Sequence, residues 1–124
     1  MTTGWGVAQA RGSSAVLQQR IATTTTTARC NGTAGWHKYI TDAMLCAVYK
    51  HGKGGMCNGA AGDPLVCMSK KRQWILHGLS SWTEIYRCKA RSRPPVYTRV
   101  RKFVSWIKRT ITEQDRGMTH VAEV

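Results

Sequence analysis

Short apolar runs separated by glycine, proline and polar clusters recur along this chain of 124 residues, and they constrain its fold more than any other feature. Runs of this length, bounded by turn-forming residues and lacking a helical repeat, predict β-strands. Consecutive strands without helices between them predict an all-β protein, either an antiparallel sandwich or a barrel. We expect strands at Val16–Ala22, Met44–Val48, Pro64–Met68, Trp74–Trp82 and Pro95–Val100.

One amphipathic helix is expected after the last strand. Phe103, Ile107 and Ile111 recur there every four residues, with basic residues on the opposite side. This pattern favours a terminal helix packed on the core over a basic helix that binds a membrane. Large apolar residues become rare beyond it, so we expect one domain over residues 1–112 and a disordered tail over residues 113–124. No apolar run approaches the ~18 residues of a membrane span, so no transmembrane segment is expected.

Lysine and arginine outnumber aspartate and glutamate by 19 to 6, which gives a formal net charge of +13. Twelve of the basic residues lie between Lys70 and Arg109, where Glu84 is the sole acid. A solvated basic face is the simpler interpretation, and a site for heparin-like polyanions or anionic surfaces is the alternative. Tryptophans lie among these cations, but core packing explains them better, so no specific nucleic-acid partner is expected.

Five cysteines in so short a chain indicate an oxidising compartment. Their spacing contains no Cys-x-x-Cys pair, and the four scattered histidines complete no tetrahedral site, so we expect disulfides and neither a metal nor a cofactor. The odd count leaves at least one sulfur without a partner in the chain. Residues 1–5 show no signal peptide, which conflicts with secretion. We therefore expect either an excised piece of a secreted precursor or a truncated product.

Residues 57–67 read CNGAAGDPLVC and resemble the C-x-G-D-S-G-G-P-L-V-C motif of the trypsin-like serine proteases. Gly78–Trp82 and Pro95–Val100 resemble the substrate-binding strand and the closing strand of that family. With further matches upstream, the resemblance covers about residues 3–111. It implies the second six-stranded antiparallel barrel of the chymotrypsin-like double barrel, with an incomplete first strand and a C-terminal α-helix. Details near Trp74 look more like the elastase branch than like trypsin itself.

The same resemblance implies that the catalytic machinery is degenerate. Ala61 stands at the position of the family's nucleophilic serine, and a methyl group cannot attack a carbonyl. The family's histidine and aspartate belong to the N-terminal barrel, which we expect to be absent here. The backbone N–H groups of Gly59 and Ala61 would form the oxyanion hole. Ala60 replaces the aspartate that pairs with the new N-terminus after zymogen cleavage, and Asp63 replaces a glycine whose loss could disturb the loop.

The residues implied for the specificity pocket are also altered. Gly55 lies at the base, where trypsin has an aspartate, and Thr83 and Pro95 replace wall glycines. Ser81 and Trp82 belong to the strand beside which substrates dock. We therefore expect a shallow or closed pocket without a charge that would select a basic side chain.

Family pairing implies two disulfides, Cys30–Cys46 and Cys57–Cys88, and leaves Cys67 unpaired because its usual partner would lie one residue before Met1. A buried, inert thiol is favoured over a replacement nucleophile at Cys67. Asn31 begins an Asn-Gly-Thr sequon and is a candidate for glycosylation if the chain is secreted.

These features lead to one main hypothesis, a catalytically dead serine protease homologue that acts, if at all, by binding. Half of a two-barrel domain would expose an apolar face, so a protein partner covering that face is expected. Three alternatives stay open. The chain could be a serine-type endopeptidase by family membership only, a cationic protein that binds polyanions or anionic surfaces, or a truncated product without function. By resemblance and cysteine content we expect it to be extracellular.

Overall fold

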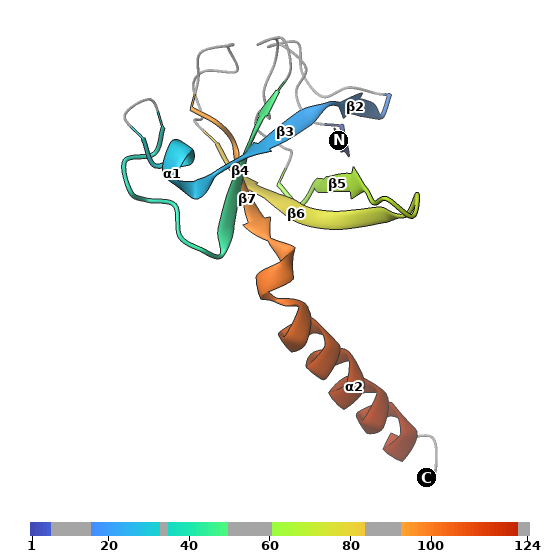
Figure 1. Cartoon of the computed structure of the whole chain (residues 1–124). Coiled ribbons are helices and arrows are strands. Elements are labelled where there is room, and N and C mark those ends of the chain that lie inside the picture. Colours follow the sequence, from blue (N-terminus) through green and yellow to red (C-terminus); the bar gives the residue numbers. More distant parts are fainter. Residues whose placement is uncertain (6–15, 33–34, 50–60, 84–92, 122–124) are drawn as a thin grey trace.

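The computed structural model describes residues 1–5, 16–32, 35–49, 61–83 and 93–121, and these form one antiparallel sheet followed by a long helix (Figure 1). The strand order in the sheet is β2-β1-β5-β6-β7-β4-β3. The strands are β1 Thr2–Gly4, β2 Gln18–Arg20, β3 Ala22–Thr25, β4 Met44–Tyr49, β5 Pro64–Met68, β6 Trp74–Trp82 and β7 Val96–Arg99. The helices are α1 Thr27–Cys30, the 3-10 helix η2 Val100–Lys102 and α2 Val104–Val121.

The two outer strands of this order, β2 and β3, are halves of one segment that bends at Ile21. The first half pairs with β1, where Thr2 lies opposite Arg20, and the second pairs with β4, where Ala22 lies opposite Tyr49. Because the two edges of the sheet are covalently continuous, the sheet closes on itself as a barrel. If β2 and β3 are counted as one strand, the barrel has six strands, and the first of them, β1, has only three residues. The predicted six-stranded barrel half with an incomplete first strand is therefore confirmed.

Two apolar clusters lie on opposite faces of the sheet. Along β7, Val96 and Tyr97 are both fully buried, and alternation sends their side chains to different faces. Tyr97 joins the cluster that contains Leu65, and Val96 joins the cluster around Cys30 and Trp36. Burying side chains of this size contributes about 1.5–3 kcal/mol each. Within its cluster the Tyr97 hydroxyl has a hydrogen-bond partner in the Tyr49 hydroxyl at 2.8 Å, and burial raises the pKa of Tyr97.

A short helix that the strand pattern did not predict, α1, connects β3 to the apolar cluster around Cys30 and Trp36. The side-chain oxygen of Thr26 accepts a hydrogen bond from the backbone N–H of Arg29 at 3.2 Å, which caps the N-terminus of α1. At the other end of α1, Cys30 forms a disulfide with Cys46 of β4. The disulfide predicted between these two residues is therefore confirmed.

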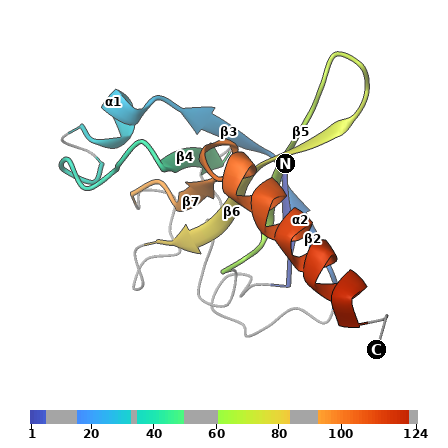
Figure 2. The same cartoon turned by 90° about the horizontal axis from the view of Figure 1, so that it is seen from below.

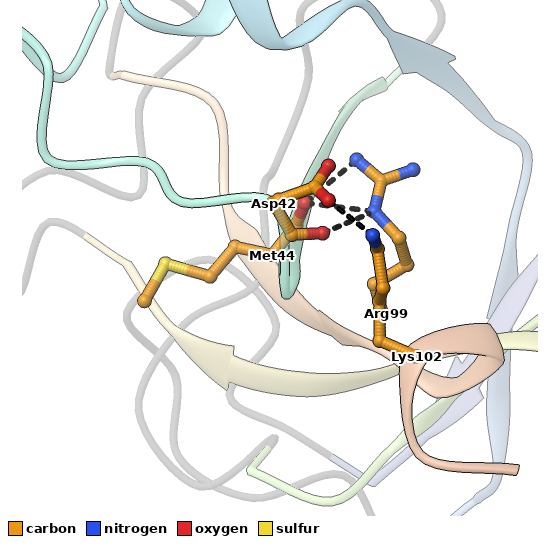
Figure 3. Close-up of polar contacts among 4 residues, drawn as sticks. All are labelled: Asp42, Met44, Arg99 and Lys102. Carbon is orange, nitrogen blue, oxygen red and sulfur yellow. Dashed lines mark hydrogen bonds and ion pairs between the residues drawn. The ribbon is translucent and has the colours of Figure 1, made fainter. Parts of the chain in front are cut away.

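Hydrogen bonds and an ion pair connect β7 and η2 to the start of β4 and to the turn before it (Figure 3). The Arg99 guanidinium donates to the backbone carbonyl of Met44 at 2.7 Å and to that of Asp42 at 2.9 Å. Lys102 forms an ion pair with the carboxylate of Asp42, and its hydrogen bond lowers the pKa of Asp42. These contacts fix the point from which α2 leaves the barrel.

Helix α2 projects from the barrel instead of packing on the core (Figures 1 and 2). Its apolar residues Val104, Trp106, Ile107 and Ile111 are all exposed, so the expected core-docked helix is wrong. The expected amphipathic pattern is present, but the described residues leave its apolar face uncovered. The helix also continues to Val121, past the domain boundary expected at residue 112, and that boundary stays a prediction.

Candidate functional site

The loop that carries Ala61 is hydrogen-bonded to β6 near the C-terminal end of that strand. The backbone N–H of Gly62 donates to the carbonyl of Ser80 at 2.7 Å, and the N–H of Ser80 donates to the carbonyl of Asp63 at 2.9 Å. Gly62 has φ +88°, a left-handed conformation that suits glycine. This turn leaves Ala61 exposed beside the strand, where the side chain presents only a methyl group.

Asp63 is the residue for which a disturbance of this loop was expected, and in the described part of the loop Gly62 and Asp63 each form a hydrogen bond with Ser80. The carboxylate turns toward Gly4 and fills the space that a β-carbon there would need. Its partial burial there raises the pKa of Asp63, since desolvation disfavours the charged form. The absence of a side chain at Gly4 therefore accommodates the residue that departs from the family motif.

The end of β6 carries the residues expected to line the substrate strand. Ser81 is exposed and Trp82 is half-buried, with a register shift between Ser80 and Trp82. The Trp82 ring meets the ring of Trp36 edge to face, with 4.5 Å between the centroids. Such aromatic pairs contribute about 0.5–1.5 kcal/mol beyond their burial.

Trp36 is a site residue that the sequence reasoning missed. It is buried, its indole N–H donates to the carbonyl of Pro94 at 2.7 Å, and the guanidinium of Arg93 lies 5.1 Å from its ring centroid. These contacts join the segment after α1 to the segment before β7. In the sequence, Trp36 follows a turn that contains Gly32 and Gly35. Such a turn has no strand or helix repeat, so the sequence pattern could not show whether the tryptophan faces the core.

The two expected pocket walls lie at the ends of neighbouring strands. Trp82 of β6 pairs with Val96 of β7, so the antiparallel register places Thr83 and Pro95 next along the two strands. Pro95 is buried, and its carbonyl accepts a hydrogen bond from the N–H of Ala47 at 3.3 Å, while Thr83 is half-buried. The structure thus brings both wall residues to one end of the sheet.

Several predicted site residues lie outside the described residues, namely Gly55, Cys57, Gly59, Ala60 and Cys88. The oxyanion hole, the pocket base and the second disulfide therefore stay predictions. Cys67 carries a free, half-buried thiol on β5. Among the described residues, no group of three or more His, Cys, Asp or Glu side chains is placed to hold a metal ion.

Asn31 uses its side-chain amide inside the fold. The amide oxygen accepts from the N–H of Ile40 and the amide nitrogen donates to the carbonyl of Ile40, both at 3.0 Å. An attached glycan would replace one of the two hydrogens on that nitrogen and leave the other to donate to Ile40. Glycosylation at Asn31 stays a prediction.

Comparison with known proteins identifies the family. The family model described as Trypsin matches residues 1–107. The chain is 33% identical over 110 residues to human chymotrypsin-like elastase family member 3B, covering 88% of this chain and 40% of that protein. It is 32% identical over 108 residues to human transmembrane protease serine 11B, covering 86% of this chain and 26% of that protein.

The chain thus spans between a quarter and two fifths of the length of these relatives. Although one relative is called a transmembrane protease, no helix in the described part of this chain is long and apolar enough to cross a membrane. The family match, the barrel and the motif loop held against β6 agree with one another. The chain belongs to the trypsin family of serine proteases.

Proposed function

We propose that this chain is a catalytically inactive member of the trypsin family that acts by binding. One observation carries the proposal: Ala61 occupies the nucleophile position of an otherwise recognisable motif loop, and that loop is held against β6 by the hydrogen bonds of Ser80. A methyl group has no lone pair to attack a carbonyl and no proton to give to a base, so no acyl-enzyme can form. Peptide hydrolysis by the family mechanism is thereby blocked.

The strand that would bind a substrate, β6, departs less from the family pattern than the catalytic residues do. Ser81 remains exposed at the end of β6, and Trp82 is supported by its edge-to-face contact with Trp36. This arrangement supports a role in holding an extended peptide without cleaving it. The disulfide between Cys30 and Cys46 supports an extracellular location, because such bonds persist in oxidising compartments.

The direct test is reaction of the purified chain with a serine-directed fluorophosphonate and with elastase-, trypsin- and chymotrypsin-type peptide substrates. The expected result is neither labelling nor turnover. Inhibitor-sensitive turnover by the unmodified chain would overturn the proposal. Titration of an uncleaved apolar peptide, followed by Trp82 fluorescence and repeated with Trp82→Ala, tests the binding role separately. Absence of any Trp82-dependent binding would contradict that role and leave the catalytic conclusion standing.

A further inference from the structure

The turn between β5 and β6 presents three consecutive cations, Lys70, Lys71 and Arg72, all of them exposed. Ser69 holds the turn closed: its N–H donates to the carbonyl of Gln73 at 2.8 Å, and its hydroxyl accepts from the N–H of Gln73 at 3.1 Å. The N–H of Arg72 donates to the Ser69 carbonyl at 3.0 Å. No ion pair to these cations occurs within the described residues. The hairpin therefore ends in a structured turn whose positive charges are not neutralised by an ion pair with any residue that the structure describes.

An apolar strip lies directly behind the cations. Met68 pairs with Trp74 and Val66 pairs with Leu76, so the alternation of side chains places these two pairs on one face of the hairpin. Trp74 is 56% exposed, Met68 51% and Leu76 41%. Ile75, which points to the other face, is 46% exposed. The hairpin end projects from the barrel in Figure 2. The exposed fractions show that apolar side chains are uncovered on both of its faces.

A surface of this composition suits one ligand chemistry better than others. A sulfated glycan would pair with the three cations but would leave the strip of Met68, Trp74 and Leu76 in water. The interface of an anionic bilayer satisfies both, because phosphates and carboxylates meet the cations while tryptophan and aliphatic side chains enter the headgroup region. A second copy of this chain would bring like charges together, since the net charge is +13.

We propose that the end of the β5–β6 hairpin binds the surface of anionic phospholipid membranes. Lys70, Lys71 and Arg72 contact the headgroups, and Trp74 and Met68 insert into the interface without spanning it. This role goes beyond the proposed function and does not depend on the chemistry at Ala61. Binding should weaken steeply with salt, because the cations are exposed and their attraction is screened over a Debye length.

The test is co-sedimentation of the full chain with phosphatidylcholine vesicles, with and without about one third phosphatidylserine. We expect binding only to the anionic vesicles. The triple variant Lys70→Gln, Lys71→Gln and Arg72→Asn should bind about 100-fold more weakly, since each cation near the surface contributes roughly a factor of 5. Asparagine replaces Arg72 because this residue has φ 58°, in the left-handed region, which asparagine tolerates better than glutamine does. The matched control removes three exposed charges from elsewhere, Arg101→Gln, Lys108→Gln and Arg109→Gln, and should bind within about twofold of the wild type.

A pair of tryptophan variants tests the apolar half of the proposal. Trp74→Ser should weaken binding about tenfold and abolish the quenching of fluorescence by brominated lipid that comes from this residue. Trp106→Ser removes a tryptophan of α2 that is 57% exposed, against 56% for Trp74. This control should change neither the affinity for the vesicles nor the quenching that comes from Trp74. Circular dichroism checks that both variants keep the fold.

Three results would overturn the proposal: no binding to anionic vesicles, equal losses in the hairpin variants and their matched controls, or lipid quenching that survives Trp74→Ser. Retention on heparin by the wild type but not by the triple hairpin variant, without any vesicle binding, would also overturn it in favour of a sulfated glycan.

Discussion

The carboxylate of Asp63 fills the space that a β-carbon at Gly4 would occupy, so a residue of the motif loop depends on a glycine of the neighbouring strand β1, far away in the sequence. The dependence predicts that Gly4→Ala destabilises the chain by about 1 kcal/mol, because the carboxylate must rotate away. In an Asp63→Ala background the same substitution should cost almost nothing. Urea unfolding of the four chains in this double-mutant cycle measures the coupling.

Gly35→Ala is the matched control for that cycle. A β-carbon at Gly35 would overlap the backbone carbonyl oxygen of Cys30, which also accepts the N–H of Trp36 and cannot rotate away. Its penalty should exceed that of Gly4→Ala and should be unchanged by Asp63→Ala. Equal penalties for Gly4→Ala with and without the carboxylate would show that Asp63 and Gly4 are not coupled.

The raised pKa of Asp63 predicts a pH dependence of stability. Desolvation raises the pKa above its ordinary value of 3.8, so the folded state binds this proton more tightly than the unfolded state. The free energy of unfolding contributed by Asp63 therefore falls as the pH rises from the ordinary pKa to the raised one, and stays low above it.

Asp63→Asn should remove this contribution and make the chain relatively more stable above the raised pKa. The measurement is the difference in unfolding free energy between wild type and variant across that interval. The difference cancels the contributions of other carboxylates, including Asp42, whose lowered pKa acts in the opposite direction. A difference that does not vary with pH would contradict the prediction.

The disulfide between Cys30 and Cys46 should be the main covalent support of the barrel segment around α1. It closes a loop with a sequence separation of 16, and a loop of that length predicts about 3 kcal/mol of stabilisation. Substituting both residues by alanine should therefore lower the unfolding free energy by about 3 kcal/mol. Cys67→Ala, at a half-buried free thiol, should cost about 1 kcal/mol or less. Peptide mapping of oxidised protein would contradict this assignment if Cys30 and Cys46 were found in separate bridges.

Restoring the hydroxyl by Ala61→Ser should not create a protease in the 124-residue chain. Serine is a weak nucleophile without an adjacent base, and we expect the family's histidine and aspartate to belong to the other barrel. Fluorophosphonate labelling and peptide turnover of the variant are expected to stay at background. Activity in the variant, lost again on Ser→Ala reversion, would show that a base within this chain serves the position.

Local sequence patterns predicted much of the barrel. The ranges Pro64–Met68 and Trp74–Trp82 match β5 and β6, because alternation and flanking turn residues act over a few positions. The motif around Ala61 located the candidate site for the same reason. The disulfide between Cys30 and Cys46 came from the family resemblance, since spacing alone allows other pairings.

Contacts between distant residues decided the rest. The expected strand Val16–Ala22 is divided into β2 and the start of β3, because its two halves pair with different strands to close the barrel. The amphipathic repeat of α2 predicted an apolar face correctly, but whether another surface covers that face depends on the fold and not on the helix.

Sequence alone thus determined most of the strands and the motif that contains Ala61, since these are properties of neighbouring residues. Only the tertiary structure decided that the barrel closes through one bent segment, that Gly4 makes room for Asp63, and that Trp36 supports Trp82. Each of these joins residues far apart in the chain. Such contacts form because packing and closure select among many compatible pairings, and no local periodicity records which pairing is selected.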